Sequence, residues 1–194
     1  LEMNNCTASA KSIDLATVSE PVNRWIVSEF NTAVARTTAA VEAYRFNEAA
    51  DTIYGFIWNA YCDWYVELIK PQLDGEAGET RATAATVLEA SLRLLHPFMP
   101  YLTEELNEKI FGSEELMITA AWPEQVVLPE SDAPAEISFL ISLITDIRHI
   151  RSEMNVPLSA KPVLQMRGLS DLQARSIDIN KAALLRLARL GAVE

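Results

Sequence analysis

The chain has 194 residues, of which 49% are hydrophobic, and a formal net charge of −11 at pH 7. This is enough for one sizeable core, or for a medium domain with a small appendage, and it excludes a disordered chain. The longest apolar runs are far shorter than the ~18 residues of a membrane span, and we find no secretory leader, so we expect a soluble, cytoplasmic protein. Cys6 and Cys62 are the only cysteines, which argues against a disulfide scaffold.

The negative charge argues against a nucleic-acid partner, because phosphate binding depends on lysine and arginine. The charge is uneven, however. Residues 1–135 carry 8 basic and 21 acidic side chains, whereas residues 136–194 carry 8 basic and 6 acidic ones. Any polyanion bound by the first part would have to be recognised locally, by shape.

In chain order, residues 1–16 are polar and mixed, and we take them as an entry segment beginning at Leu1, inside a longer chain. A capping hydroxyl, an acid and a first-turn proline follow at 17–21. Apolar residues then recur at helical spacing as far as Tyr44. The pattern predicts a long amphipathic helix.

A second helix is expected to be capped by Asn47 and Glu48 and closed by Lys70 and Pro71. Its apolar positions repeat at i, i+3, i+4 and i+7. These expected core positions are Ala50, Ile53, Tyr54, Ile57, Tyr61, Trp64, Tyr65 and Leu68.

An acidic loop at 74–79 precedes a third helix that begins near Thr80. Pro97 and Pro100 should break this helix, because proline lacks a donor and clashes with the preceding turn. Helix then resumes and should end at Gly112.

The rest of the chain is expected to have a different character. Extended chain at 117–123 leads into a proline- and acid-rich linker over 123–134. A helix over 136–153, a strand over 161–166 and a helix over 177–190 follow. A lone strand is unstable, so either residues from 190 onward pair with it or its partner lies beyond Glu194.

The sequence therefore predicts a mainly α fold. A helical bundle occupies 17–122, the linker 123–134, and a helix with a small, truncated α/β segment 135–194.

Candidate chemistry is sparse. The glycines do not have phosphate-loop spacing, and His96 and His149 are isolated from a second ligand motif. Cys62 next to Asp63 is unlike a nucleophile pair, because a carboxylate raises a thiol's pKa. Three acids near a helix start favour the helix dipole rather than catalysis: Glu104, Glu105 and Glu108. We predict no catalytic residues, no metal site and no cofactor in this chain.

The stretch 56–71 raises a different question, because it packs five aromatic rings into one helix. At about 100° per residue the expected core positions lie on one side. The other arc holds Phe56, Trp58, Asn59, Cys62, Asp63, Val66 and Lys70. Either another helix covers this arc, or it is an exposed platform on which RNA bases stack while polar groups read their edges.

The same residues carry a family resemblance. The runs are Arg45-Phe46-Asn47-Glu48-Ala49-Ala50, Cys62-Asp63-Trp64-Tyr65, Leu94-Leu95-His96-Pro97-Phe98-Met99-Pro100 and Ile147-Arg148-x-Ile150-Arg151. This pattern resembles the anticodon-binding helical domain of class I aminoacyl-tRNA synthetases, and the Cys-Asp-Trp-Tyr run resembles the valyl type. The resemblance covers most of residues 20–170.

The resemblance implies that the parent protein attaches valine to tRNA with ATP and Mg²⁺, and that this chain grips the anticodon stem and loop. The His-Ile-Gly-His and Lys-Met-Ser-Lys-Ser signatures of the catalytic domain are absent. We therefore expect a fragment that is inactive alone and whose partners are tRNA and the catalytic and editing domains of the same parent.

The expected anticodon-binding residues are Arg45, Trp58, Asn59, Asp63, Val66 and Lys70. Candidate tRNA-backbone contacts are Arg148, Arg151 and Lys161, for which a solvated helix face is an equal alternative. Two other functions stay open, namely the same domain of a leucyl or isoleucyl enzyme, and a helical protein-interaction module.

Overall fold

The computed structural model describes residues 13–73 and 77–194. Cys6, most of the predicted entry segment and part of the acidic loop lie outside these residues. The chain divides into two compact units between Pro129 and Glu130, a point inside the predicted linker. The mainly α fold is confirmed, because the described residues form helices and one small two-stranded sheet.

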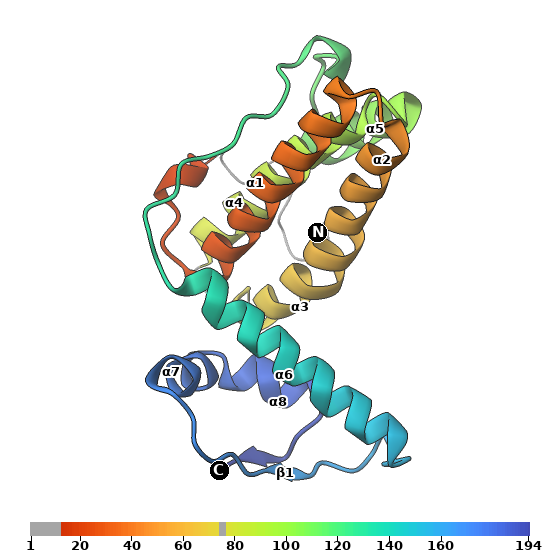
Figure 1. Ribbon diagram of the computed structural model, residues 1–194. Coiled ribbons are helices and arrows are strands. Elements are labelled where there is room, and N and C mark those ends of the chain that lie inside the picture. The colour runs from red at the N-terminus through yellow and green to blue at the C-terminus, as the bar shows by residue number, and fades with distance from the viewer. Residues whose placement is uncertain (1–12, 74–76) are drawn as a thin grey trace. The chain divides into compact units, whose positions relative to one another are not determined.

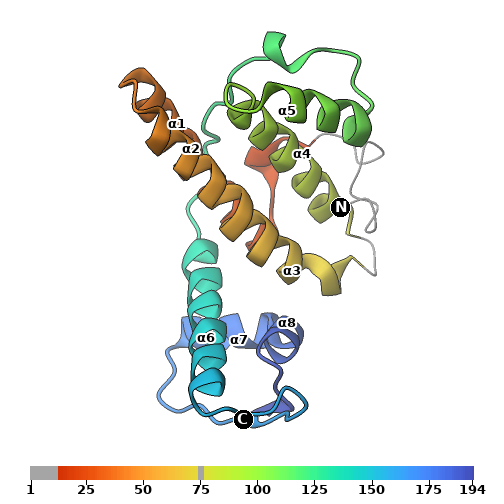
Figure 2. The same ribbon diagram turned by 90° about the vertical axis from the view of Figure 1, so that its right-hand side faces the viewer.

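The first unit is a bundle of helices (Figure 1). Its elements are η2 (Leu15–Thr17), α1 (Pro21–Glu42), α2 (Phe46–Gly55), η3 (Phe56–Tyr65), α3 (Val66–Ile69), η4 (Lys70–Gln72), α4 (Gly78–Leu95), α5 (Pro100–Leu106), η5 (Asn107–Phe111) and η6 (Met117–Thr119). The helices α2, η3 and α3 run on as one continuous rod beside α1 (Figures 1 and 2).

The hairpin between α1 and α2 turns through a residue in an uncommon conformation. Tyr44 follows α1 with a φ of 56°, in the left-handed region. The Arg45 amide donates to the Ala40 carbonyl at 2.8 Å, which closes the helix end as glycine usually does. The rod therefore begins at Phe46, and the predicted side-chain cap at Asn47 and Glu48 is wrong.

The middle of the rod is a π-helix, η3, which the sequence reading did not foresee. Hydrogen bonds in a π-helix run from i to i+5, so each residue turns by less than the ~100° of an α-helix. Phe56, Tyr61 and Tyr65 consequently all point into the core. On an α-helix, Phe56 and Tyr61 would lie on different faces.

The tyrosine hydroxyls of this π-helix anchor it to its neighbours. Tyr61 donates to the Ala84 carbonyl on α4 at 2.7 Å, and Tyr65 donates to Asn23 Oδ1 on α1 at 2.8 Å. The Phe56 ring packs against Phe30 with the ring centroids 5.7 Å apart. Both buried tyrosine hydroxyls are thus paired, which removes the penalty of burying them.

One carboxylate joins the start of α4 to the start of α1. Glu79 accepts hydrogen bonds from the Ser19 and Glu20 amides, the Ser19 hydroxyl and the Asn23 side-chain amide. Burial would raise the pKa of Glu79, but these bonds outweigh burial and lower that pKa.

The two prolines act as predicted. The helix α4 ends at Leu95, and α5 begins with Pro100 at its first position. Gly112 follows η5 with a φ of 62°, which confirms the predicted stop. Residues 117–119 form a short 3-10 turn rather than extended chain.

The second unit contains α6 (Ala133–Glu153), β1 (Val163–Leu164), α7 (Asp171–Ile179), α8 (Lys181–Leu187) and β2 (Ala192–Val193). The strands are parallel, with Val163 opposite Ala192 and Leu164 opposite Val193, so residues beyond 190 do pair with the predicted strand. The single helix predicted over 177–190 is wrong. A capping box at Ser170 starts α7 earlier, and the chain breaks at Asn180 before α8.

No helix of the described residues is long and apolar enough to cross a bilayer.

The lowered pKa of Glu79 generates a pH prediction. A carboxylate with a depressed folded pKa stabilises the fold above its unfolded pKa, and this stability is lost as pH falls through the folded pKa. Glu79→Gln should lower the free energy of unfolding near neutral pH by about 2 kcal/mol, the scale of hydrogen bonds to a charged group. Below about pH 4 the difference from the parent should shrink.

Urea unfolding across this pH range measures the effect, with Glu124→Gln, an exposed acid, as the control. A difference that stays constant down to low pH would contradict this role for Glu79.

A glycine contact in the second unit generates another prediction. A Cβ at Gly191 would lie 2.7 Å from the Lys161 carbonyl oxygen, while the Gly191 amide donates to the Pro162 carbonyl. Gly191→Ala should destabilise the second unit by about 1 to 3 kcal/mol, the usual cost of overpacking. Hydrogen exchange of the β1 and β2 amides would report it.

Gly55→Ala is the matched control. Gly55 has helical backbone angles, and a Cβ there meets nothing within 4 Å. This change should stabilise the first unit by about 0.5 to 1 kcal/mol. Equal effects of the two changes would refute the close contact.

Candidate nucleic-acid interface

The rod formed by α2 and η3 exposes one continuous face, which we call the aromatic face. Its exposed members are Tyr54, Trp58, Asn59, Cys62 and Asp63. They recur at intervals of four or five residues, which matches the wider turn of the π-helix. The π-helix thus separates this face from the buried ring of Tyr61 on the opposite side.

The centre of the aromatic face is a pair of parallel rings. The centroids of Tyr54 and Trp58 lie 6.1 Å apart, and the ring planes differ by only 4°. Tyr54 is 64% exposed and Trp58 is 55% exposed. Large apolar rings held parallel and open to solvent are suited to stacking against another flat ring.

A second ring pair lies where α1 turns into α2. Tyr44 and Phe46 meet edge to face with centroids 6.3 Å apart. Tyr44 is 82% exposed although its left-handed backbone is unfavourable for a bulky residue. The chain therefore keeps an aromatic ring at the tip of the hairpin where glycine would be less strained.

A positively charged side chain lies near each end of the rod. Arg45 lies 3.4 Å from Glu48, and Lys70 forms an ion pair with Glu67. Both cations are exposed, and surface pairs of this kind contribute at most about 1 kcal/mol. Either cation can therefore exchange its carboxylate for a phosphate at little cost.

The structure corrects several sequence assignments. Phe56, placed on the outer arc, is buried and only 6% exposed. The π-helix explains this, since the sequence reading assumed about 100° per residue throughout. Tyr54, placed in the core, is exposed, because the regular helix α2 turns Ala49 and Ile53 inward instead. Three further expected core positions are only partly buried: Ala50, Ile57 and Trp64. Val66 is partly buried at the edge of the face.

Tyr44, Phe46 and Tyr54 were not among the expected binding residues. Signals in the sequence pointed to the two tyrosines but not to Phe46. A tyrosine stands where a helix end favours glycine, and Tyr54 lies four residues before Trp58 on the same rod.

Cys62 does not add nucleophilic chemistry to this face. Partial burial of its sulfur raises the pKa of the Cys62 thiol, and the neighbouring Asp63 raises it further. The thiol therefore stays protonated at neutral pH.

The expected cations of the second unit differ in what they contact. Arg151 is only 9% exposed, and its guanidinium donates to the carbonyls of Arg189, Pro157 and Ala160. The Arg148 Nε donates to the Leu187 carbonyl, although Arg148 is exposed. Lys161 is exposed. These contacts favour a structural part for Arg151.

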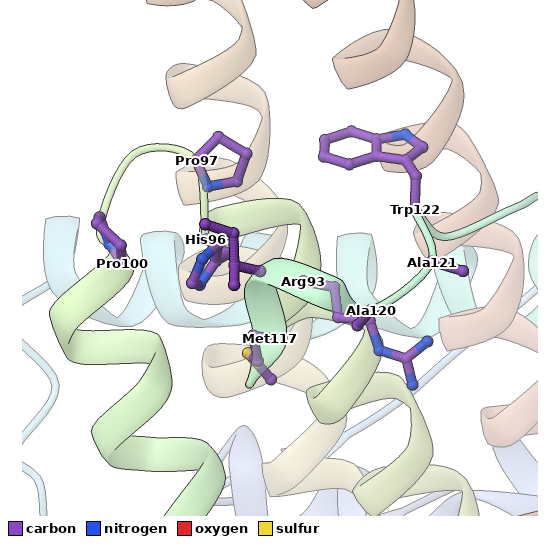
Figure 3. Close-up of a pocket in the computed structure, with 9 residues that line it drawn as sticks. Arg93, His96, Pro97, Pro100, Met117, Ala120, Ala121 and Trp122 are labelled. Carbon is purple, nitrogen blue, oxygen red and sulfur yellow. The ribbon is translucent and has the colours of Figure 1, made fainter. Parts of the chain in front are cut away.

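A cavity of about 410 Å³ lies elsewhere in the first unit, between the last turn of α4, the start of α5, and η6 with the segment that follows it (Figure 3). Trp122 lies at one side of it and donates to the Thr38 hydroxyl at 2.9 Å. His96 lines it and is held 2.8 Å from the Thr103 hydroxyl through Nδ1. The cavity contains none of the predicted binding residues.

The described residues bring no three histidine, cysteine, aspartate or glutamate side chains together in a group suited to a metal ion.

Comparison with known families gives this geometry a context. Residues 23–166 match the family described as the anticodon-binding domain of tRNA ligase. The chain belongs to this family. The aromatic face lies entirely within the matched residues, as do Arg45, Lys70 and the cavity.

Individual relatives are valine–tRNA ligases. The chain is 46% identical to the enzyme of Caulobacter vibrioides over 99% of this chain and 22% of that protein. It is 41% identical to that of Rhizobium meliloti over 100% of this chain and 21% of that protein. For Granulibacter bethesdensis the identity is 44%, over 93% and 21%. The chain thus spans about a fifth of the length of these relatives, and their names favour the valyl over the leucyl or isoleucyl interpretation.

Replacing a ring by alanine is expected to change the free energy of unfolding differently on the two sides of the rod. Phe56→Ala removes a buried ring from its contact with Phe30 and should lower the free energy of unfolding by about 3 to 5 kcal/mol. Trp58→Ala, two residues away, should change it by about 0.5 kcal/mol or less, since the indole lies on the surface. Denaturant titrations of both variants measure this, and a larger loss for Trp58→Ala would show that Trp58 is a core residue.

Proposed function

We propose that this chain binds the anticodon stem and loop of a tRNA through the aromatic face. The observation that carries the proposal is the parallel, exposed pair of Tyr54 and Trp58 on a domain of the anticodon-binding family. Single-stranded RNA loops are commonly bound by stacking their unpaired bases on aromatic rings. An exposed ring pair would supply that surface.

The residues of the rod divide by their chemistry. Trp58 stacks on a loop base, and the side chains of Asn59 and Asp63 accept or donate at base edges. Arg45 and Lys70 contact backbone phosphates by exchanging their ion pairs. Val66 contributes apolar contact at the edge of the face.

For the second unit we keep Lys161 and Arg148 as contacts to the tRNA backbone. Both are exposed, and residues 136–194 carry 8 basic and 6 acidic side chains. Arg151 instead holds three carbonyl groups, so we assign it to the stability of the unit.

We further propose that the chain is part of a cytoplasmic valine–tRNA ligase. The relatives bear that name, and the parent would join valine to its tRNA with ATP and Mg²⁺. The two catalytic signatures are not in this sequence, so ATP, Mg²⁺ and the chemical step belong to catalytic and editing domains outside these residues.

Binding of a stem-loop with a valine anticodon tests the proposal. Trp58→Ala should weaken binding by about 1 to 3 kcal/mol, the scale of stacking on one ring, while the fold is retained. Tyr101→Ala removes a ring on α5 that is even more exposed than Trp58, and serves as the control. Fluorescence anisotropy at constant salt gives the affinities.

The salt dependence separates RNA from a protein partner. Two phosphate contacts predict that the logarithm of the binding constant falls with the logarithm of salt at a slope of about −1 to −2. A stem-loop that does not bind would overturn the proposal and favour a protein-interaction module. A preference for a leucine or isoleucine anticodon would overturn the valyl assignment.

A further inference from the structure

We propose that residues 122–129 form a strap that docks reversibly on α1 and sets the length of the chain that connects the two units. This inference goes beyond the proposed function and does not depend on the binding of RNA. Three features of the first unit carry it, namely the spacing of three side chains on α1, the atoms of the strap that they hold, and the small part of the strap that is buried.

Three polar side chains form a row along α1, and their spacing is seven residues. They are Arg24, Asn31 and Thr38. Seven residues of an α-helix turn by about 700°, which is close to two full turns, so the row lies on one stripe of the helix with its members about 10 Å apart. All three side chains are partly exposed, so the row can hold a segment at the surface.

The middle member of the row binds the strap as a neighbouring strand would. Asn31 donates from Nδ2 to the Val126 carbonyl and accepts at Oδ1 from the Val126 amide, both at 2.7 Å. The Gln125 side chain donates to the Asn31 carbonyl at 3.4 Å. One amide side chain therefore pairs both backbone polar groups of Val126, in a segment that forms no helix or strand.

The outer members of the row hold the two ends of the strap. Arg24 donates to the Pro129 carbonyl, and the Thr38 hydroxyl accepts from the Trp122 indole N–H at 2.9 Å. The strap thus runs antiparallel to α1 (Figure 1). Three or four residues of extended chain span about the 10 Å between neighbouring members of the row. The spacing of the row therefore fits an extended segment.

The strap is held mainly by these hydrogen bonds and only slightly by burial. Of its residues only Pro123 is buried, and the Val127 side chain is 87% exposed. A segment with few buried apolar contacts and exposed hydrogen bonds opens at a lower cost in free energy than the core does. The strap can therefore leave α1 while the bundle stays folded.

Release of the strap changes the length of the connection between the units. The boundary between the units lies directly after Pro129, the last residue that the row holds. While the strap is docked, the chain is fixed to α1 as far as this boundary. After release, the residues of the strap add at most about 25 Å of extended chain to the connection.

Cleavage by a protease specific for glutamate tests the release, because Glu124 lies in the strap. Asn31→Ala removes both bonds to Val126 and should speed cleavage after Glu124 in the whole chain about tenfold, since the rate follows the population of the open segment. Asn31→Asp keeps the acceptor but loses the donor and should give an intermediate rate. Thr38→Val frees the other end of the strap and should also speed cleavage. Mass spectrometry identifies the products.

Thr32→Ala is the matched control. Thr32 is the exposed neighbour of Asn31, and its hydroxyl donates to the Ser28 carbonyl within α1. This change should leave cleavage after Glu124 unchanged. Urea titrations of the same variants show whether opening is local, because Asn31→Ala should keep the unfolding midpoint of the first unit.

Pulsed electron spin resonance measures the connection itself. One nitroxide label is attached to the exposed Cys62 of the first unit and one to Asp146→Cys on α6 of the second, with Cys6→Ser to remove the other thiol. The distribution of distances between the labels should be broader with Asn31→Ala than in the parent. With Thr32→Ala it should stay as in the parent.

The outcomes leave the proposed function untouched and decide this inference. If Asn31→Ala and Thr38→Val both leave cleavage after Glu124 unchanged, the row does not hold the strap and the inference is wrong. If cleavage rises only as far as the stability of the whole bundle falls, the strap does not open by itself. If cleavage rises but the distances keep their spread, the strap does not set the length of the connection.

Discussion

The arrangement of the first unit depends on the wide turn of the π-helix between Phe56 and Tyr65. A π-helix this long is uncommon, because π-helical geometry usually appears only as a single turn inside an α-helix. Here its inner face is held by specific contacts. The Tyr61 and Tyr65 hydroxyls bond α4 and α1, and the Phe56 ring packs on Phe30. In the π register Phe56, Tyr61 and Tyr65 all face inward, while Trp58 and Asp63 are exposed. The π-helical backbone thus accounts both for the packing that stabilises the bundle and for the residues that are exposed on the rod.

A network of polar side chains links the π-helix to the rest of the bundle. Asn23 accepts from the Tyr65 hydroxyl through one side-chain atom and donates to Glu79 through another. Glu79 in turn holds the chain just before α1. The C-terminal end of the π-helix, the start of α1 and the start of α4 are therefore linked through three side chains. Thr80 supports the network, because its hydroxyl accepts from Asn23 and its carbonyl accepts from the Tyr65 hydroxyl.

Sequence reading succeeded where one residue type enforces the backbone and failed where the backbone departed from regular geometry. Pro97, Pro100 and Gly112 punctuate the helices as expected, because the missing amide of proline and the left-handed freedom of glycine act locally. Phe56, assigned to the outer arc, is buried, and Tyr54, assigned to the core, is exposed. Nothing in the apolar spacing distinguishes a π-helix from an α-helix until Tyr61 and Tyr65 find partners on α4 and α1, which are contacts distant in sequence. Of the expected binding residues, Trp58, Asn59 and Asp63 do share one exposed face, whereas Arg151 is committed to carbonyl groups that no local pattern reveals.

The acidic character of the first unit does not conflict with the proposed binding of RNA, because its exposed rings can supply the affinity. A surface with few cations cannot rely on neutralising many phosphates, so in the proposed complex the affinity for RNA has to come from flat contacts and edge hydrogen bonds. Tyr54, Trp58, Tyr44 and Phe46 all leave large apolar area in water, and Tyr44 does so from a strained backbone. Each of these choices lowers the stability of the isolated fold, since burial of the same rings would be favourable. Features that weaken a fold and gather along one rod are best explained by what binds there.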